Sequence, residues 1–489
     1  MVVFPLFRAL LILALSTLGF AQSLVVDGEV VPANEGTVAP AFEVVDPTST
    51  NATAALFDGE THVLTDAVLR NLTDLQLTNT LLFAFPEDFD KAGIDVELAE
   101  AISGPCKTFS DDSVGFPGTI TNRVFDLLLG GSLIQTKPFA APCYADFGNE
   151  NAAECATIGS NWFNDSYIHT NDPTSINAIL FQGTSCVPHS VNPYQTHCTL
   201  GAYPKMSIRA TTVAQVQLAI NIARNLNLRL VIKNTGHDFG AKSTGAGGVS
   251  IWTHNMKDVK FYADYEEGSY SGPAFKMGAG VQVYEAYEAA NKEGVTIVGG
   301  EGRVLSMEVV TADGRFVTAS ETSNPDLFWA LRGGGGSTFG VVTSMVIRAY
   351  PKMPVATLAF RFATGDSGDS SDNNSNSSSV SVDQFWDALR AYFDGFVGYT
   401  DAGTYGYFSL GGLTGRYVFD MHPWFAPNMT RAQLEALAGP ALAELEERLG
   451  GVPVEPVYRE YDNFYDAWDA SFPLEPWGSN LARQGSRRK

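Results

Sequence analysis

Apolar runs and amphipathic stretches alternate through the middle of the chain. Thr211 to Asn225 carries apolar residues at helical spacing and opens with a threonine that can cap a helix. The short apolar run Leu228 to Ile232 follows, and Val249 to Thr253 is a second run of the same kind. A helix that leads into a strand, a loop and another strand is an α/β unit, and we predict one here.

A second unit repeats this pattern. Phe275 to Met277 leads into Gly278-Ala279-Gly280, and the amphipathic stretch Val281 to Lys292 predicts a helix before the strand Gly294 to Val298. The glycines allow another group to approach the backbone closely. Leu305 to Val310 and Arg315 to Ala319 then predict a β-hairpin, because Asp313-Gly314 is a strong turn signal between them.

Four consecutive glycines follow the predicted short helix Pro325 to Leu331. They lie in Arg332-Gly-Gly-Gly-Gly-Ser-Thr-Phe-Gly340, before the predicted strand Val341 to Ile347. Such a run is costly in chain entropy unless backbone must pass close to another group. A tight turn is the alternative, and we favour a loop that cradles a ligand.

The ends of the chain are patterned differently. Gln22 to about Thr80 is punctuated by Thr, Asn and Pro and is predicted to be loosely structured, whereas Phe125 to Leu129 predicts a helix ended by Gly130-Gly131. Near the other end, the strand Ala356 to Phe362 and the helix Val382 to Phe393 flank residues 365–382, a low-complexity surface loop. Thr430 to Leu449 predicts an amphipathic structural helix.

The most chemically suggestive stretch is Val231 to Ser243, VIKNTGHDFGAKS. Glycines 236 and 240 allow close approach of the main chain, and Thr235, Asp238 and Ser243 add partners suited to a pyrophosphate. A lone histidine such as His237 is more often structural, and that alternative stays open on spacing alone. Ala241 replaces a glycine that a P-loop requires, and no G-x-G-x-x-G run is present, so neither a P-loop nor a Rossmann fingerprint is supported.

Composition narrows the class of protein. The 489 residues have 45% apolar and 17% charged content, which predicts two or three folded domains. The formal net charge of −23, from 31 basic and 54 acidic residues, disfavours nucleic acid and anionic membranes as partners.

The N-terminal segment predicts export. Arg8 precedes the apolar run Ala9 to Leu18, and Gly19-Phe20-Ala21 offers a cleavage site, so residues 1–21 are predicted to be a signal peptide of a secreted, extracellular protein. No later segment is long and apolar enough to predict a transmembrane helix. Glycosylation sequons fit this route and occur at Asn51, Asn71, Asn164, Asn373, Asn376 and Asn428.

Cysteine usage agrees with an oxidising compartment. Five cysteines predict two disulfides and one remaining thiol, with the connectivity left open. They are Cys106, Cys143, Cys155, Cys186 and Cys198. His189, His197 and Cys198 match no zinc spacing, so no metal site is predicted.

Several of these motifs together carry a family resemblance. CTLGAYP from Cys198, VIKNTGHDF, GAGVQVYE and VTADGRFVTASETSNPDLFWALRGGGGSTFGVVT resemble the fungal FAD-linked oxidases of the berberine-bridge-enzyme-like group, in the vanillyl-alcohol-oxidase superfamily. The resemblance covers roughly Cys143 to Ser471. It implies an α+β fold with a PCMH-type FAD-binding domain of two α/β subdomains and an antiparallel-sheet substrate domain.

The resemblance also implies a cofactor site. His237 matches the histidine that attaches covalently to the flavin, and the remaining matched residues line the pyrophosphate or the rest of the FAD. The latter are Lys233, Thr235, Gly236, Asp238, Ser243, Gly278, Gly280, Gly299, Gly300 and Gly340. A histidyl link withdraws electron density from the flavin and makes hydride removal from a substrate easier.

Two departures from the family pattern limit what the resemblance implies. Members follow the glycine pair and glutamate with a cysteine, often a second flavin attachment, and a long glycine-rich segment, but Val298-Gly-Gly-Glu-Gly302 runs directly into Arg303-Val304. At most one attachment, at His237, is therefore expected. The closing part of the substrate domain is also not matched, so no catalytic residue is assigned. A gene-model artefact and a degenerate copy both remain explanations.

We expect four regions: the signal peptide, residues 22–203 with the cysteines and the start of the FAD domain, the FAD-binding domain at 204–351, and a partial substrate domain at 352–489. The predicted function is a secreted FAD-dependent oxidoreductase that oxidises an alcohol, a sugar or a secondary-metabolite intermediate. Its partners would be a small-molecule substrate and oxygen, which accepts the electrons. The alternative is a catalytically inactive flavin-binding or degenerate secreted protein.

Overall fold

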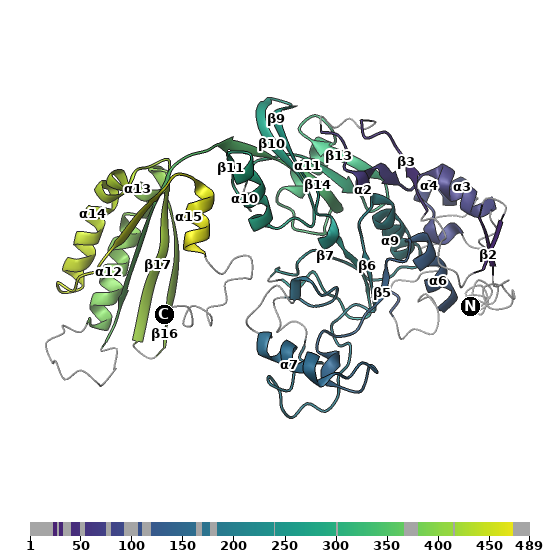
Figure 1. The fold of residues 1–489 in the computed structure, drawn as a ribbon, viewed down its shortest axis with the longest axis horizontal. Helices are drawn as coiled ribbons and strands as arrows, with labels where there is room; N and C mark the ends of the chain where they lie inside the picture. The colour runs from purple at the N-terminus through teal and green to yellow at the C-terminus, as the bar shows by residue number, and fades with distance from the viewer. Residues whose placement is uncertain are drawn as a thin grey trace. The chain divides into compact units, whose positions relative to one another are not determined.

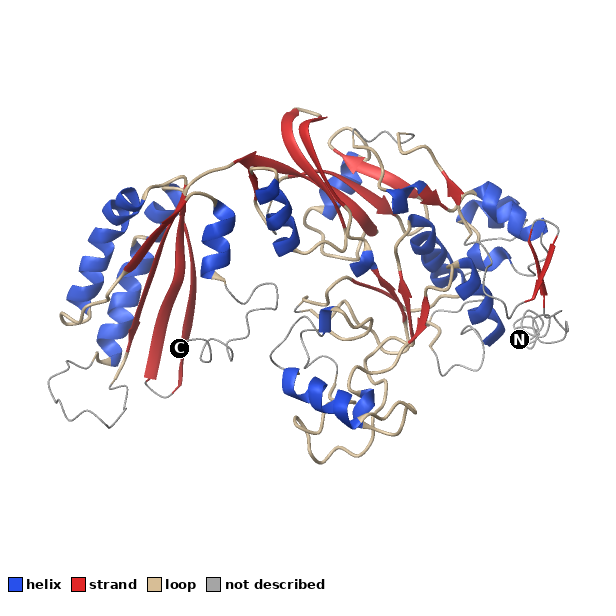
Figure 2. Ribbon diagram, in the orientation of Figure 1, coloured by secondary structure: helices blue, strands red, loops and turns tan. Residues whose placement is uncertain are grey.

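The computed structural model describes residues 23–26, 29–32, 41–48, 54–74, 80–91, 106–109, 119–162, 169–176, 183–238, 240–299, 302–365, 380–413 and 416–472. These divide into two compact units. The first contains the chain up to Ala286 together with Val298–Arg348, and the second contains Tyr287–Ile297 and Ala349–Glu475. Helices accompany sheets in both units, so the chain is α+β as predicted (Figure 2).

A four-stranded sheet in the first unit carries the His237 loop. Its order is β5 (Leu133–Gln135), β6 (Met206–Arg209), β8 (Val249–Trp252) and β7 (Leu230–Lys233), with β6, β8 and β7 parallel and β5 antiparallel (Figure 1). The predicted strands on either side of the loop are confirmed within one or two residues. Because parallel strands need a crossover, α9 (Val213–Asn225) connects β6 to β7.

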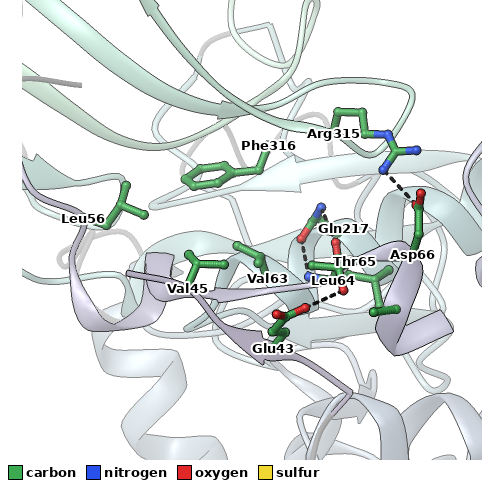
Figure 3. A pocket seen from close by; sticks show the side chains of 11 residues that line it. Glu43, Val45, Leu56, Val63, Leu64, Thr65, Asp66, Gln217, Arg315 and Phe316 are labelled. Atoms are coloured by element: carbon green, nitrogen blue, oxygen red, sulfur yellow. Dashed lines mark hydrogen bonds and ion pairs between the residues drawn. The ribbon is translucent and has the colours of Figure 1, made fainter. Parts of the chain in front are cut away.

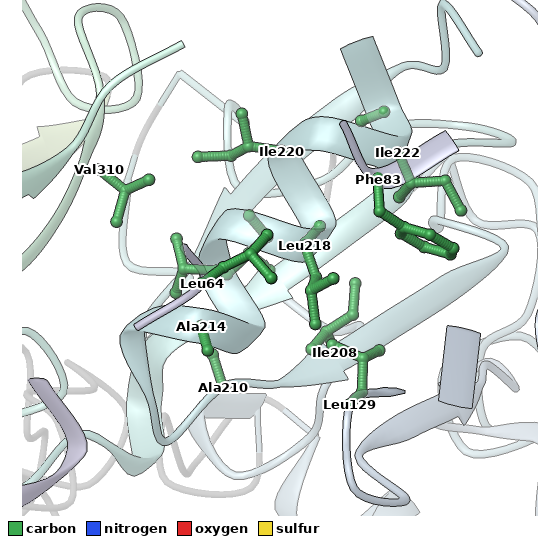
Figure 4. Close-up of a cluster of buried hydrophobic side chains, with 14 of the residues drawn as sticks. Leu64, Phe83, Leu129, Ile208, Ala210, Ala214, Leu218, Ile220, Ile222 and Val310 are labelled. Atoms are coloured by element: carbon green, nitrogen blue, oxygen red, sulfur yellow. The ribbon is translucent and has the colours of Figure 1, made fainter. Parts of the chain in front are cut away.

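Helix α9 lies at the centre of the main hydrophobic core (Figure 4). Thr212 caps it, since its hydroxyl accepts from the backbone N–H of Gln215, and the Gln215 side chain completes a capping box. Leu218 and Ile222 are fully buried, and Ile208 of β6 belongs to the same core. The helix predicted from the apolar spacing is therefore confirmed, and its cap is Thr212, one residue after the opening Thr211.

The N-terminal region is more ordered than the sequence suggested. Its described elements are β1 (Ser23–Val26), β2 (Glu29–Pro32), β3 (Glu43–Val44), α2 (Asp58–Thr61), β4 (His62–Val63), α3 (Asp66–Asp74), η1 (Thr80–Phe83), α4 (Pro86–Lys91) and α6 (Thr119–Leu128). Leu64 and Phe83 are buried in the core, and α9 side chains bond their backbone: Gln217 Oε1 accepts from Leu64 N at 2.7 Å and Asn221 Nδ2 donates to Phe83 O at 2.9 Å. The prediction of a loose segment from Gln22 to Thr80 is wrong for these parts, because long-range packing orders them.

The second sheet of the first unit is antiparallel. Its order is β13 (Phe316–Ser320), β12 (Val304–Val310), β14 (Val341–Pro351), β10 (Tyr270–Gly278) and β9 (Val259–Glu267). The β12–β13 pairing confirms the predicted hairpin, with Gly314 at φ +85° in the turn. Helix α11 (Pro325–Leu331) has the predicted bounds, and β14 confirms the strand after the glycine run. The short helix η4 (Thr253–Asn255) follows β8.

The second unit contains an antiparallel sheet in the order β16 (Tyr405–Leu413), β17 (Arg416–Pro427), β15 (Val355–Ala363) and β18 (Val457–Tyr461). Helices α12 (Val382–Asp394) and α14 (Arg431–Arg448) pack on one face, and α13 (Phe396–Asp401) follows α12. Helix α15 (Phe464–Ser471) packs against Val355 and Phe425 on the other face. This unit also includes most of α10 (Val283–Lys292), and β11 (Val295–Ile297), which pairs with the end of β14.

Two disulfides join Cys143 to Cys155 and Cys186 to Cys198, while Cys106 is a free, exposed thiol. Two bridges and one remaining cysteine were expected, and the structure confirms this count. The bridged cysteines, η2 (Ala141–Cys143) and α7 (Ala152–Asn161) surround a small separate core that contains Trp162. Among the described residues, no helix combines the length and apolar character needed to cross a membrane.

Candidate flavin site

The loop after β7 is held in an unusual backbone conformation. Gly236 has φ +82°, which favours glycine, and a Cβ atom there would lie 3.1 Å from both Ser175 O and Ile176 Cα. The loop therefore passes directly against residues 169–176. The next residue, His237, has an exposed side chain.

Residues 169–176 form a compact turn that the sequence analysis did not single out. Asp172 Oδ1 accepts from Thr174 N at 2.8 Å and Ser175 N at 2.7 Å, so the carboxylate folds the segment on itself. Asp172-Pro173-Thr174-Ser175 is a turn signal that could have identified the turn, although not its neighbour. Thr170 of this segment reaches the site: its Oγ1 is 3.0 Å from His237 Nε2.

Lys233 joins the turn to the loop. Its Nζ is fully buried and donates to the carbonyl oxygens of Asp172 at 2.8 Å, Thr170 at 3.3 Å and His169 at 3.4 Å, and also to Asn234 O at 3.3 Å. Burial lowers the pKa of Lys233 to about 8, against the opposing effect of Asp172. The amino group thus faces protein carbonyls, whereas the family resemblance had assigned this lysine to the pyrophosphate loop.

His237 is held as a neutral imidazole. Loss of solvent around the ring lowers its pKa, and the nearby Lys233 charge lowers it further. Its backbone N–H donates to Thr235 Oγ1 at 3.3 Å. A neutral ring keeps a nitrogen lone pair, which a nucleophile requires.

Asn234 connects the loop to the Gly278-Ala279-Gly280 turn. Its Nδ2 donates to Ala279 O at 2.8 Å, and its Oδ1 lies 3.0 Å from His254 Nδ1. Burial, together with the nearby charges of Lys257 and Lys233, lowers the pKa of His254 to about 4, so this ring is also neutral. Neither residue was predicted to belong to the site, and nothing in the local sequence marks this contact.

Asp238 closes the second half of the loop. Its carboxylate accepts from Lys242 N at 2.6 Å and from the Ser243 hydroxyl. Asp238 and Ser243 therefore satisfy each other and shape the loop. The exposed Lys242 side chain extends from it toward the glycine run, since a Cβ atom at Gly335 would lie 3.4 Å from Lys242 Nζ.

The glycine run forms an exposed loop beside Lys242. Gly335 has φ +90° and Ser337 has φ +62°, and Cβ atoms at Gly333 and Gly336 would meet nothing within 4 Å. Exposed backbone with open space around it, next to a cation, fits a phosphate-bearing ligand. Gly340, at φ +158°, packs instead against Val309 and Val310 at the base of the loop.

The other predicted glycines do not lie in the exposed glycine run. Cβ atoms at Gly278 and Gly280 would come within 2.4 Å of Met256 O and 2.3 Å of His254 O, so both glycines allow the protein backbone to pack closely on itself. Gly299 is described and partly exposed, while Gly300 lies outside the described residues. The structure thus brings together residues 169–176, 233–243, 278–280 and 332–340.

A separate pocket of about 480 Å³ lies between the N-terminal segment and α9 (Figure 3). Leu56, Val63 and Phe316 supply apolar walls, and Gln217 is fully hydrogen-bonded to backbone groups on its floor. None of the predicted site residues lines it. It is therefore distinct from the His237 site.

The fold and the site define a flavin-binding domain, and comparison with known proteins agrees. Residues 204–300 match the family model described as FAD binding domain. The chain is 34% identical to the FAD-linked oxidoreductase ZEB1 of Gibberella zeae and to the VAO-type flavoprotein oxidase VAO615 of Thermothelomyces thermophilus. Each alignment covers 77% of this chain and 67% of the relative.

Other comparisons extend this result. The FAD-linked oxidoreductase sthB of Phaeosphaeria nodorum is 35% identical over 61% of this chain and 98% of its own length. The crystal structure of the VAO-type flavoprotein MtVAO615 from Myceliophthora thermophila C1 is 34% identical, with a TM-score of 0.68 over 76% of this chain and 69% of that chain. The protein belongs to the family of FAD-linked oxidoreductases of the VAO type, and FAD is its cofactor.

Proposed function

We propose that FAD lies across the His237 loop and the glycine run and is bound covalently through His237. The observation that carries this proposal is the neutral His237 ring beside Thr170, on a loop that Asn234 ties to the Gly278–Gly280 turn. The backbone around Gly333 to Gly336 and the Lys242 charge supply donors for the pyrophosphate. Bound FAD would accept a hydride from the substrate.

The substrate that we propose is an alcohol, a sugar or a secondary-metabolite intermediate, with oxygen as the final electron acceptor. Support comes from relatives whose names describe a flavoprotein oxidase and FAD-linked oxidoreductases. We also propose secretion after removal of residues 1–21. The two disulfides and the sequon at Asn428 agree with an exported protein.

Absorption spectroscopy of the purified full chain tests attachment. After acid precipitation, we expect the yellow colour to stay with the wild-type protein and to be released from His237→Ala. His197→Ala is a matched control, because His197 is an exposed histidine whose side chain is 81% accessible beside Asp146. A colourless wild-type protein would overturn the proposal, and colour released from the wild type would leave FAD binding but exclude the covalent link.

A further inference from the structure

Within the described residues, one nitrogen of the His237 ring, Nε2, has a hydrogen-bond partner. Nε2 lies 3.0 Å from Thr170 Oγ1, and in the described part of the chain no hydrogen bond to Nδ1 is present. Which nitrogen of a neutral imidazole carries the hydrogen depends on the bond that the other nitrogen makes. The partner of Nε2 therefore decides whether Nδ1 has a free lone pair.

Thr170 is fixed in place independently of His237. Three carbonyl oxygens of residues 169–172, including that of Thr170 itself, accept from Lys233 Nζ. On the other side, the His169 ring lies 2.6 Å from Ser175 Oγ and 3.0 Å from Trp162 O. Thr170 is 1% exposed, so its hydroxyl cannot be replaced by bulk water without disturbing these contacts.

We propose that Thr170 is a positioning residue that holds His237 in the tautomer with hydrogen on Nε2, leaving the Nδ1 lone pair for the cofactor. This inference rests on the proposed attachment of FAD to His237. In this tautomer Nε2–H donates to Thr170 Oγ1. The bond strengthens when the ring gains positive charge, because charge-assisted hydrogen bonds are about twice as strong as neutral ones.

The attachment that Thr170 would assist couples formation of a C–N bond to reduction of the flavin. A C–N bond forms between Nδ1 and the ring methyl carbon of the flavin, and one methyl C–H bond and the imidazole N–H bond break. The two hydrogens leave as two protons with two electrons, which reduce the isoalloxazine. Oxygen, the acceptor in the proposed function, then reoxidises it and becomes hydrogen peroxide. Thr170 itself is neither oxidised nor consumed.

The test compares Thr170→Val, which keeps the shape and removes the hydroxyl, with Thr170→Ser, which restores it. Full-length protein produced without flavin is mixed with FAD, and the acid-stable flavin is followed with time. Thr170→Val should attach FAD about tenfold more slowly, as expected for one lost hydrogen bond, and Thr170→Ser should attach it at close to the wild-type rate. Thr174→Val is the control within the same turn, because Thr174 Oγ1 bonds Asp172 and not His237.

A second measurement does not depend on the cofactor. Proton–nitrogen correlation spectra of flavin-free protein labelled with ¹⁵N-histidine report the tautomer of each ring, and His237→Ala identifies the relevant signal. We expect hydrogen on Nε2 in the wild type and in Thr170→Ser, and a mixture of tautomers in Thr170→Val. An unchanged tautomer in Thr170→Val, or attachment at the wild-type rate, would overturn the inference. If the wild type binds FAD without attaching it, the proposed covalent link fails, and the tautomer spectra still decide the role of Thr170.

Discussion

Two buried lysines in the first unit are satisfied in different ways. Lys276 on β10 forms an ion pair with Glu60 of α2 at 2.7 Å, and the other Glu60 oxygen accepts from the hydroxyls of Thr343 and Ser344. Among the described residues, no ion pair of Lys233 with a carboxylate is present, and its Nζ donates to carbonyl oxygens. Both side chains are almost fully buried, at 1% and 0% exposure.

The two lysines have different structural roles: Lys276 anchors the N-terminal segment, whereas Lys233 positions a loop and a turn. The Lys276 pair ties the N-terminal segment to the antiparallel sheet, since Lys276 Nζ also donates to Ala55 O at 3.0 Å. The Lys233 contacts shape a loop and a turn at the candidate flavin site. Carbonyl dipoles compensate a buried charge less fully than a carboxylate does, which is why burial lowers the pKa of Lys233 to about 8.

Lys276→Met should have the largest effect. It leaves the Glu60 carboxylate buried without its cation, and breaking a buried pair in this way costs about 3–5 kcal/mol. Urea denaturation would measure the free energy of unfolding. The double variant Glu60→Gln/Lys276→Met should recover much of the loss, because no charge is then left behind. A loss no larger than that of the exposed Lys292→Met would contradict this account.

Stability should next depend on Glu308, which lies near the Lys276 pair on β12. Burial raises its pKa from 4.5 to about 8, with Lys276 opposing the rise and Glu60 adding to it. Between these pH values the folded chain keeps a proton that the unfolded chain has lost, so stability falls as pH rises, by up to about 1.4 kcal/mol per pH unit. Glu308→Gln should flatten this slope in unfolding experiments from pH 5 to pH 8.

Lys233 should make the free energy of unfolding change with pH in the opposite direction, at higher pH. Its pKa is 10.5 in the unfolded chain and about 8 when folded, so in this window the unfolded chain binds the extra proton. Stability then rises with pH. Lys233→Met should remove this rise and cost about 1–3 kcal/mol at neutral pH, because carbonyl groups lose their donor. If Lys233→Met lowered the free energy of unfolding as much as Lys276→Met does, the proposed difference between the two lysines would be wrong.

Gly236→Ala should have the smallest effect on stability and a specific effect on the site. Gly131→Ala is a matched control: Gly131 has φ +80°, close to the +82° of Gly236, and a Cβ atom there would meet nothing within 4 Å. Each variant should lose about 1 kcal/mol of unfolding free energy, because alanine is strained at a positive φ. Gly236→Ala also presses on Ser175 and Ile176, so acid-stable flavin should fall in this variant alone. Equal flavin content in both would show that the contact is unimportant.

Local patterns predicted local structure well. Apolar spacing and a cap identified α9, Asp313-Gly314 identified the β12–β13 turn, and Pro325 began α11. The contact of the 169–176 turn with the His237 loop and the packing of the N-terminal segment were missed because they depend on distant partners. Lys233 bonds carbonyls more than sixty residues away, and Glu60 accepts from Ser344 across 284 positions. The spacing of apolar residues along the sequence does not predict which distant backbone groups a buried lysine will contact.

The same limit applies to the candidate site. The VIKNTGHDF and glycine-run motifs led to residues that the structure brings together, and FAD as the cofactor is confirmed by the family. The motif did not reveal that Lys233 is buried and donates to carbonyl oxygens, and its place in a pyrophosphate loop stays a prediction. Thr170, Asn234 and Lys242 were missed for the same reason, since their importance comes from what faces them.

The two disulfides lie on either side of the turn at residues 169–176 in the sequence. One bridge closes before residues 169–176 in the sequence and the other closes after them, and each spans only 12 positions. The small core that contains the bridged cysteines also contains Trp162, whose carbonyl oxygen lies 3.0 Å from His169 Nε2 at the start of the turn that faces His237. Protein made in a reducing compartment should keep its main core but present a looser turn. We expect protein whose cysteines are kept reduced to hold less FAD than protein with both bridges formed.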